Sequence, residues 1–223
     1  MADPTSRRPL LALLGGTFDP VHYGHLHLAD DVQRALHPAE VRLIPGGDPP
    51  HRDAPRASAT HRLAMLELAR TEFPALTIDR REIDRGGKSY TVRTLESLRS
   101  DEPSRPLAWI VGADALAGIP TWHRWRDLFE LAHIIVVARP GFELDVSDPP
   151  LADEWRERLT NSPADLTAAR AGSIYVQAVT PYPISASAIR AELARGPAGE
   201  AAVRGLLPES VLAYIGRNRL YQP

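Results

Sequence analysis

Two histidines stand three residues apart in the segment Gly15-Gly16-Thr17-Phe18-Asp19-Pro20-Val21-His22-Tyr23-Gly24-His25. An apolar run at residues 10–14 precedes this segment, and residues with helical periodicity follow it. Glycines let the backbone come close to a ligand, and the N–H groups at the start of a helix attract anions. Because residues three apart can share one face of a helix, we expect His22 and His25 to act together on the phosphates of a nucleotide.

Other interpretations of this segment remain open. Thr17 stands where the dinucleotide-binding fingerprint needs its second glycine, so that motif is absent. The triplet Gly87-Lys88-Ser89 resembles the end of a Walker loop, but Glu82 occupies the upstream position that requires glycine. A third histidine, His27, would suit a metal site, although no acidic residue stands at a known zinc-ligand spacing. A tight turn with two incidental histidines is the simplest alternative.

The composition is that of an ordinary globular protein. The 223 residues carry a net charge of −2, which gives no basic excess for a general nucleic-acid scaffold. The chain has no cysteine, which excludes disulfides, thiol nucleophiles and cysteine-ligated zinc. No stretch of the sequence has the length and apolarity of a membrane-spanning helix. We therefore expect a cytoplasmic protein that binds neither nucleic acid nor membranes, and we leave homo-oligomer formation open.

Expected strands and helices alternate along the chain. The expected strands are the apolar segments at residues 10–14, 41–44, 76–78, 107–111, 134–137 and 174–176. One expected helix follows the first strand as far as Pro38, and others lie near residues 63–69, 91–98, 122–131, 155, 187–194 and 211–215. The charged, glycine-containing segment at residues 80–89 is expected to be a loop.

This order of elements predicts an α/β fold. Alternating strands and helices form βαβ units, which build a Rossmann-like, doubly wound and mostly parallel sheet flanked by helices. We expect one domain over residues 1–223, with residues 1–9 as a flexible tail and a small helical part near the C-terminal end. Ligands bind such sheets beyond the carboxyl ends of the strands. The turns after Leu14 and Val111 are therefore the expected ligand positions.

Three further segments offer side chains to a ligand. Ser185 and Ser187 precede an apolar helix, where serines are ordinary N-caps but can also hold a phosphate. Arg190 follows about one turn later, within reach of phosphate oxygens for its guanidinium. Trp122 is either a core residue or a ligand contact. The segment Ser89-Tyr90-Thr91 precedes a helix, where its N–H groups either receive a carboxylate or form a plain loop.

Several motifs occur in a fixed order along the chain. After Gly15 to His25 come Pro49-Pro50-His51-Arg52, Ser89-Tyr90-Thr91-Val92-Arg93-Thr94-Leu95, Gly112-Ala113-Asp114, Trp122, Arg139-Pro140-Gly141 and Ile184-Ser185-Ala186-Ser187-Ala188-Ile189-Arg190. In this combination they resemble the motifs of bacterial nicotinate mononucleotide adenylyltransferases, which belong to the nucleotidyltransferase superfamily with the His-x-Gly-His motif. The resemblance covers nearly the whole chain, and the combination of motifs is highly specific.

The resemblance implies that ATP and nicotinate mononucleotide are converted to nicotinic acid adenine dinucleotide and pyrophosphate in NAD biosynthesis. It implies that His22, His25 and Arg190 are catalytic, and that Mg²⁺ is held by substrate phosphates with no ligand from the protein. The residues implied in ATP binding are Gly15, Gly16, Thr17, Phe18, His22, His25, Gly112, Asp114, Ile184, Ser185, Ser187 and Arg190. Those implied in nicotinate mononucleotide binding are His51, Arg52, Ser89, Tyr90, Thr91, Asp114 and Trp122.

Three residues depart from the family's motifs. Arg93 stands where aspartate is usual, Arg52 replaces lysine, and Ala186 stands where a second serine is common. Two alternatives to the implied activity remain. One is the same chemistry on nicotinamide mononucleotide or another phosphorylated acceptor such as phosphopantetheine, and the other is a nucleotide-binding regulator without catalysis.

Overall fold

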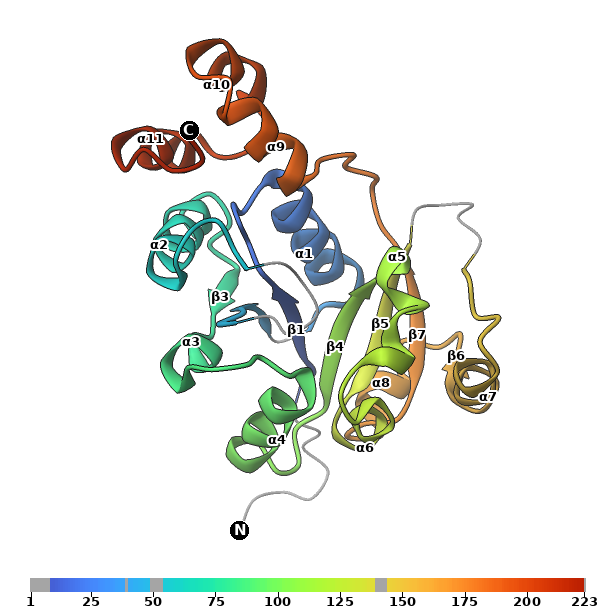
Figure 1. The fold of residues 1–223 in the computed structure, drawn as a ribbon. Coiled ribbons are helices and arrows are strands. Elements are labelled where there is room, and N and C mark those ends of the chain that lie inside the picture. Colours follow the sequence, from blue (N-terminus) through green and yellow to red (C-terminus); the bar gives the residue numbers. More distant parts are fainter. Residues whose placement is uncertain (1–8, 39, 49–53, 139–143, 223) are drawn as a thin grey trace. The chain divides into compact units, whose positions relative to one another are not determined.

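A sheet of seven strands forms the framework of the computed structural model, which describes residues 9–38, 40–48, 54–138 and 144–222 (Figure 1). The strand order is β3-β2-β1-β4-β5-β7-β6, and the pairs β1–β4, β4–β5, β5–β7 and β6–β7 are parallel. The expected Rossmann-like α/β fold is confirmed. The strands are β1 (Leu11–Gly16), β2 (Glu40–Pro45), β3 (Leu76–Ile78), β4 (Leu107–Gly112), β5 (His133–Ala138), β6 (Leu159–Thr160) and β7 (Ile174–Ala178).

The chain forms two compact units, each assembled from three separate segments. Unit 1 comprises Met1–Gly15, Val32–Arg42 and Tyr90–Val179, and unit 2 comprises Gly16–Asp31, Leu43–Ser89 and Thr180–Pro223. Helix α1 (Tyr23–Leu36) and strand β2 each contribute residues to both units. The single domain expected over residues 1–223 stays a prediction.

Unit 1 is built on β4, β5 and β7, which lie side by side (Figure 1). All six residues of β5 are buried, as expected for a parallel strand that is covered on both faces. Helix α4 packs against α6, and α7 packs against the 3₁₀ turn η1. The helical elements are α4 (Thr91–Asp101), α5 (Ala113–Leu116), η1 (Ile119–Thr121), η2 (Trp125–Asp127), α6 (Leu128–Leu131), α7 (Pro149–Arg158) and α8 (Asp165–Ala168).

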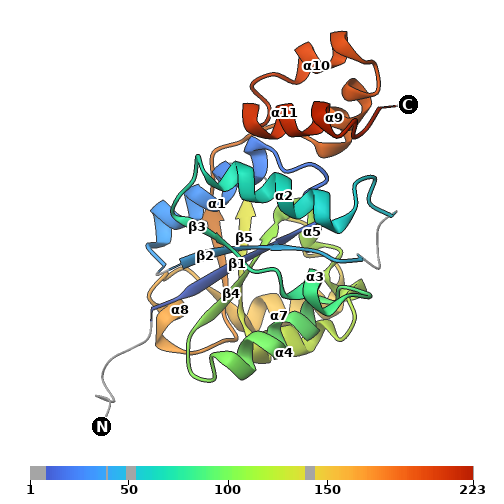
Figure 2. The same ribbon diagram turned by 90° about the vertical axis from the view of Figure 1, so that its left-hand side faces the viewer.

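Unit 2 contains most of the remaining helices. They are α2 (Ala59–Arg70), α3 (Arg81–Arg85), α9 (Ala186–Leu193), α10 (Pro197–Val203) and α11 (Glu209–Arg217). Helix α9 packs against α10 and α11 packs against α2, and Figure 2 shows α9, α10 and α11 as one group. These three helices are the small C-terminal helical part that the sequence predicted.

Several expectations about elements need correction. The segment at residues 80–89 contains the short helix α3, where a loop was expected. The segment at residues 122–131 is not one helix, because the 3₁₀ turn η2 and the short helix α6 occupy only residues 125–131. The helix expected near residues 63–69 is α2, and its buried residues are Arg62, Met65, Leu66 and Ala69. Among the described residues, no helix is long and apolar enough to cross a membrane.

Candidate active site

The two histidines of the opening motif lie face to face at the start of α1. Their ring centroids are 3.7 Å apart with an interplanar angle of 26°, and the edge of the Phe18 ring meets His25 at 5.0 Å. The His22 carbonyl accepts the N–H of His25 at 2.9 Å, which begins the helix. A Cβ atom on Gly24 would lie 3.0 Å from the His22 ring, so glycine leaves room for that ring. The expectation that the histidines share one face agrees with this geometry.

Burial keeps the His22 imidazole neutral. Only 4% of His22 is exposed, and its burial lowers the pKa of the side chain from 6.5 to about 4. Within the described part of the chain, the buried Nδ1 atom of His22 has no hydrogen-bond partner. A buried polar atom without a partner costs free energy, and a ligand that supplies a partner recovers it.

At the start of α1, fewer backbone N–H groups are free to bind an anion than the sequence suggested. The Tyr23 N–H donates to the Leu206 carbonyl at 2.9 Å, and the His25 N–H donates to the His22 carbonyl. Leu206 lies in the connection between α10 and α11, which covers this end of the helix. These two N–H groups therefore stabilise the protein itself, and the side chains of the motif carry more of any anion binding.

Internal packing explains the two glycines of the βα turn. A Cβ atom on Gly15 would lie 2.7 Å from Cη2 of Trp109, and one on Gly16 would lie 2.9 Å from Cζ of Phe18. Phe18 itself adopts a positive φ of 51°, which folds its ring back over Gly16. The carbonyl of Gly16 accepts the Gly46 N–H at 2.9 Å, which ties the turn to the residue after β2. Glycine at position 15 is thus required by Trp109 whether or not a ligand approaches.

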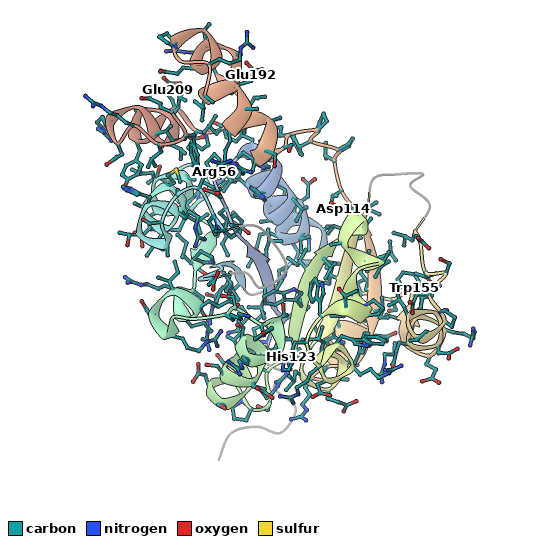
Figure 3. All side chains as sticks on the ribbon, viewed as in Figure 1. Arg56, Asp114, His123, Trp155, Glu192 and Glu209 are labelled. Carbon is teal, nitrogen blue, oxygen red and sulfur yellow. The ribbon has the colours of Figure 1, made fainter. Side chains whose placement is uncertain are left out.

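Asp19 is a hydrogen-bonding centre that the sequence analysis did not identify. Its carboxylate, in a residue that is 5% exposed, accepts the Arg56 N–H at 2.8 Å, the Ala57 N–H at 3.0 Å and the Tyr221 hydroxyl at 2.8 Å. Burial and this carboxylate raise the pKa of Tyr221. Arg190 donates from Nη1 to the backbone carbonyl of Asp19 at 2.7 Å. Figure 3 labels Arg56, which lies in the segment that leads to α2.

Arg190 and Ser187 belong to the same cluster in unit 2. Arg190 donates from Nη2 to Ser187 Oγ at 3.2 Å, and the Ser185 hydroxyl accepts the Ala188 N–H as the N-cap of α9. The Cβ atom of Ile184 lies 3.5 Å from the position that a Cβ on Gly24 would occupy. Unit 2 therefore places Ile184, the first residue of the C-terminal motif, next to Gly24, and joins Arg190, the last residue of the motif, to Asp19.

The segment around Ser89 differs from its expected role. The Ser89 hydroxyl accepts the Gly47 N–H at 2.8 Å, and the Ser89 N–H donates to the Asp48 carbonyl at 2.8 Å. Because the Ser89 N–H already donates to a carbonyl within the protein, it is not available to the carboxylate of a ligand. Ser89 instead holds the segment after β2 in place. His51 and Arg52, the expected acceptor residues of that segment, lie outside the described residues.

Unit 1 holds the other expected acceptor residues. Tyr90 is the N-cap residue of α4 without a side-chain cap, and its ring lies 4.7 Å from that of His123 and 5.4 Å from Cζ of Arg93. Thr91 is the first residue of α4, and Trp122 follows η1 directly and is half-buried. His123, the residue after Trp122, is labelled in Figure 3.

Gly112 and Asp114 lie where β4 passes into α5. A Cβ atom on Gly112 would clash with Oδ1 of Asp114, so glycine here admits the aspartate side chain. Figure 3 labels Asp114 on α5, which directly follows the end of β4. Trp125, by contrast, is buried against Phe129, as expected for a core residue.

No metal centre is evident in the described part of the chain. None of its His, Asp and Glu residues form a group of three or more that could hold a metal ion. The carboxylate of Asp19, in the same segment as the histidines, is already occupied by three donors.

Comparisons with known proteins agree with the resemblance noted in the sequence. The model of the cytidylyltransferase-like family matches residues 13–192. A protein of Laribacter hongkongensis, described as a probable nicotinate-nucleotide adenylyltransferase, is 47% identical over 216 residues, which cover 96% of either chain. The chain belongs to this family of adenylyltransferases. A relative from Escherichia coli O139:H28 with the same description is 41% identical and is matched over 100% of its length and 96% of this chain.

Solved structures of adenylyltransferases share the fold. The nicotinic acid mononucleotide adenylyltransferase of Plasmodium falciparum, complexed with NaAD, superposes with a TM-score of 0.73 at 16% identity, over 96% of this chain and 98% of the other. A nicotinate-nucleotide adenylyltransferase structure from Vibrio parahaemolyticus gives a TM-score of 0.62 at 12% identity, over 96% and 95% of the chains.

Proposed function

We propose that this protein transfers the adenylyl group of ATP to nicotinate mononucleotide, giving nicotinic acid adenine dinucleotide and pyrophosphate in NAD biosynthesis. The observation that carries the proposal is the stacked pair of His22 and His25, with Arg190 bonded to Asp19 of the same motif, in a chain whose relatives are described as nicotinate-nucleotide adenylyltransferases. ATP is a cytoplasmic metabolite, and we place the activity in the cytoplasm.

The reaction needs no general base from the protein. The attacking group is the phosphate of the mononucleotide, which is mostly ionised at neutral pH because its second pKa is about 6. The barrier arises from repulsion between two anions and from the charge that gathers on the leaving pyrophosphate. Positioning and electrostatic stabilisation lower such a barrier. Stacked histidines and an arginine, without a nucleophile, suit that task.

His22 and His25 donate hydrogen bonds to the ATP phosphates in this proposal. A neutral imidazole has one N–H donor and one acceptor, whereas the protonated ring has two donors. The lowered pKa of His22 means that the ring is neutral before ATP arrives, and an adjacent triphosphate favours its protonated form. Proton uptake at His22 would add positive charge where the leaving group becomes more negative.

Arg190 holds the pyrophosphate. Two of the N–H donors of its guanidinium bond the Asp19 carbonyl and Ser187 Oγ, which fix its orientation. A guanidinium has five such donors, so the fork retains donors for phosphate oxygens. Ser185, Ser187, Ile184 and the backbone of Gly16–Phe18 complete the ATP-binding set in unit 2. Gly15, Gly112 and Asp114 of unit 1 are included on the resemblance of their motifs.

The proposed contacts of nicotinate mononucleotide are Tyr90, Thr91 and Trp122. Ser89 holds the neighbouring segment, and His51 and Arg52 are included on the basis of the sequence. Trp122 stacks on the nicotinate ring in this arrangement.

Magnesium enters the proposal through the ATP phosphates, whose oxygens are the ligands that this ion prefers. The chain fits this arrangement because the Asp19 carboxylate is already committed to three hydrogen bonds. The ion neutralises phosphate charge, and the residues of the chain supply orientation and hydrogen bonds.

A pyrophosphate-release assay tests the function. Purified protein is supplied with ATP and Mg²⁺, and with nicotinate mononucleotide, nicotinamide mononucleotide, phosphopantetheine or no acceptor. We expect the highest kcat/KM with nicotinate mononucleotide. Faster release with another acceptor would assign the chemistry to that acceptor, and ATP binding without release would identify a nucleotide-binding regulator.

A further inference from the structure

A buried arginine joins the two loops of unit 2 that follow β1 and β2. Arg62, in the first turns of α2, is 1% exposed. Its Nη1 donates to the carbonyls of Thr17 at 2.7 Å and Gly46 at 2.6 Å, and its Nη2 donates to the carbonyl of Gly47 at 2.8 Å. Its Nε donates to the Ala57 carbonyl at 3.2 Å. One guanidinium therefore contacts the turn after β1, the turn after β2 and the segment before α2.

Burial of this cation needs a reason beyond packing. Removing a guanidinium from water is costly, and the burial lowers the pKa of Arg62. The hydrogen bonds from the charged guanidinium to the carbonyls offset this desolvation cost, because such bonds are stronger than those between neutral groups. Neither the sequence motifs nor the proposed chemistry assigns Arg62 a task, although it contacts Thr17 of the proposed ATP-binding turn.

The bonded carbonyls also fix the direction of the neighbouring N–H groups. In a planar trans peptide the C=O and the N–H of the next residue point in opposite directions. The Gly46 carbonyl points to Arg62, and the N–H of Gly47 accordingly points the other way, to Ser89 Oγ at 2.8 Å. By the same geometry, the Thr17 carbonyl turns inward and the N–H of Phe18 is directed away from the guanidinium. An anion on the side of this turn away from Arg62 would therefore meet the N–H of Phe18 and not the carbonyl of Thr17.

We propose that Arg62 is a positioning residue for the ATP triphosphate: it sets the spacing of the turns after β1 and β2 and keeps their carbonyls turned away from the phosphates. The inference rests on the proposed function, because it takes ATP as the ligand of the turn at Gly15–Phe18. Arg62 itself does not touch the substrate. It acts through the backbone of Thr17, Gly46 and Gly47.

Arg99 provides a matched control in unit 1. It is also a partly buried arginine whose guanidinium donates to backbone carbonyls, including those of Glu102 at 3.0 Å and Arg105 at 2.7 Å, and burial lowers its pKa too. None of the residues that it bonds belongs to a proposed substrate contact. A lysine at either position keeps the charge but lacks the planar fork that reaches several carbonyls at once. Arg62→Lys and Arg99→Lys therefore both remove hydrogen bonds from a guanidinium to backbone carbonyls, the first in unit 2 and the second in unit 1.

The decisive measurement is the KM for ATP in the pyrophosphate-release assay. KM does not depend on the fraction of enzyme that is folded, so a purely structural role would leave it unchanged. We expect R62K to raise the KM for ATP about tenfold or more, since small displacements of positioned groups are costly. R99K should leave KM within about twofold of the wild-type value while lowering the unfolding temperature. An unchanged KM in folded R62K, or the same rise in R99K, would overturn the proposal.

A second measurement uses the wild-type protein and does not depend on the folding of R62K. In ¹⁵N-labelled protein, we expect a non-hydrolysable ATP analogue with Mg²⁺ to shift the Nε–H resonance of Arg62 and to leave that of Arg99 in place. An Arg62 signal that stays unmoved at saturating analogue would contradict the positioning role. If wild-type protein releases no pyrophosphate with any acceptor, the proposed function fails, and this spectrum still tests whether Arg62 supports a triphosphate site.

Discussion

His22 is a histidine whose surroundings decide its protonation state. The stacked ring of His25 and the burial of its own ring exclude water, which disfavours the imidazolium. In solution a histidine is partly protonated near pH 6.5, but here the ring is neutral over the whole neutral range. Under the proposed function, the His22 ring would gain a proton only when the negative charge of a bound triphosphate compensates for burial.

Removing the His22 side chain should impair turnover. We expect His22→Ala to lower kcat at least about a hundredfold, because one lost donor to developing charge costs roughly 10²–10³ in rate. The measurement is the rate of pyrophosphate release at saturating ATP and acceptor.

His27→Ala in α1, the helix that directly follows His22, is the matched control, since the His27 ring stacks on Tyr182 at 4.4 Å and has no proposed role in catalysis. It should keep near-normal kcat with some loss of stability. A near-normal rate in H22A would remove His22 from the mechanism.

The pKa of His22 also predicts how stability depends on pH. The folded-state pKa of about 4 lies below 6.5, the ordinary value for histidine, so the unfolded chain binds the proton first as pH falls. The stabilisation is therefore complete above pH 6.5 and is lost progressively between pH 6.5 and about 4, by about 3 kcal/mol in total at about 1.4 kcal/mol per pH unit. Urea unfolding of wild type and His22→Phe at pH 7 and pH 4.5 measures it. An equal pH dependence in the two proteins would contradict the assignment.

At the scale of elements, six of the seven strands coincide with apolar runs in the sequence, whereas β6, with only two residues, and the buried polar contacts gave no such signal. Strand β5 was predictable because it contains four consecutive β-branched residues at positions 134–137, and such residues are enriched in strands. Helix α3 was missed because five residues are too few to show a periodicity. For α2, residues 62, 65, 66 and 69 do follow the helical spacing of a buried face, but an arginine at the first of them is counted as a surface residue. That spacing was the available signal for Arg62.

The junction of β1 with the following turn yields a test of packing. Gly15→Ala should lower the free energy of unfolding by about 1–3 kcal/mol, because the new methyl group would overlap Cζ2 and Cη2 of Trp109. Phenylalanine lacks those two ring atoms, so Trp109→Phe in the same chain should restore part of the loss. Chemical denaturation of both single variants and the double variant gives the interaction energy. Additive effects would show that Trp109 is not the reason for this glycine.

At the scale of the whole molecule, each unit is assembled from segments that are distant in sequence. Asp19 and Tyr221 are separated by 202 residues, yet their side chains are hydrogen-bonded at 2.8 Å. Such a pair could not be inferred from local pattern, because neither residue has a neighbour in sequence that reveals the other. The same holds for the contact of Arg190 with the Asp19 carbonyl.

Loss of the Tyr221 hydroxyl should affect both stability and ATP use. We expect Tyr221→Phe to lower the free energy of unfolding by about 1–3 kcal/mol, the range for hydrogen bonds to charged groups. We also expect a severalfold lower kcat/KM for ATP, because Asp19 holds Arg190. Thermal unfolding and the pyrophosphate assay measure the two effects.

Tyr214→Phe is the control, since the Tyr214 hydroxyl lies 2.9 Å from His61 Nδ1 in the same unit. It should lower stability and leave kcat/KM for ATP unchanged. An equal kinetic loss in both variants would mean that Tyr221 acts only through general stability.

The three-segment construction of unit 2 has a consequence for the newly made chain. On the ribosome, a chain synthesised as far as residue 179 contains the complete sequence of unit 1 and lacks the third segment of unit 2. Its Asp19 has neither Tyr221 nor Arg190 to bind. Translation thus completes the sequence of unit 1 before that of unit 2. Under the proposed function, a nascent chain should therefore acquire the ability to use ATP only after residues 180–223 have left the exit tunnel.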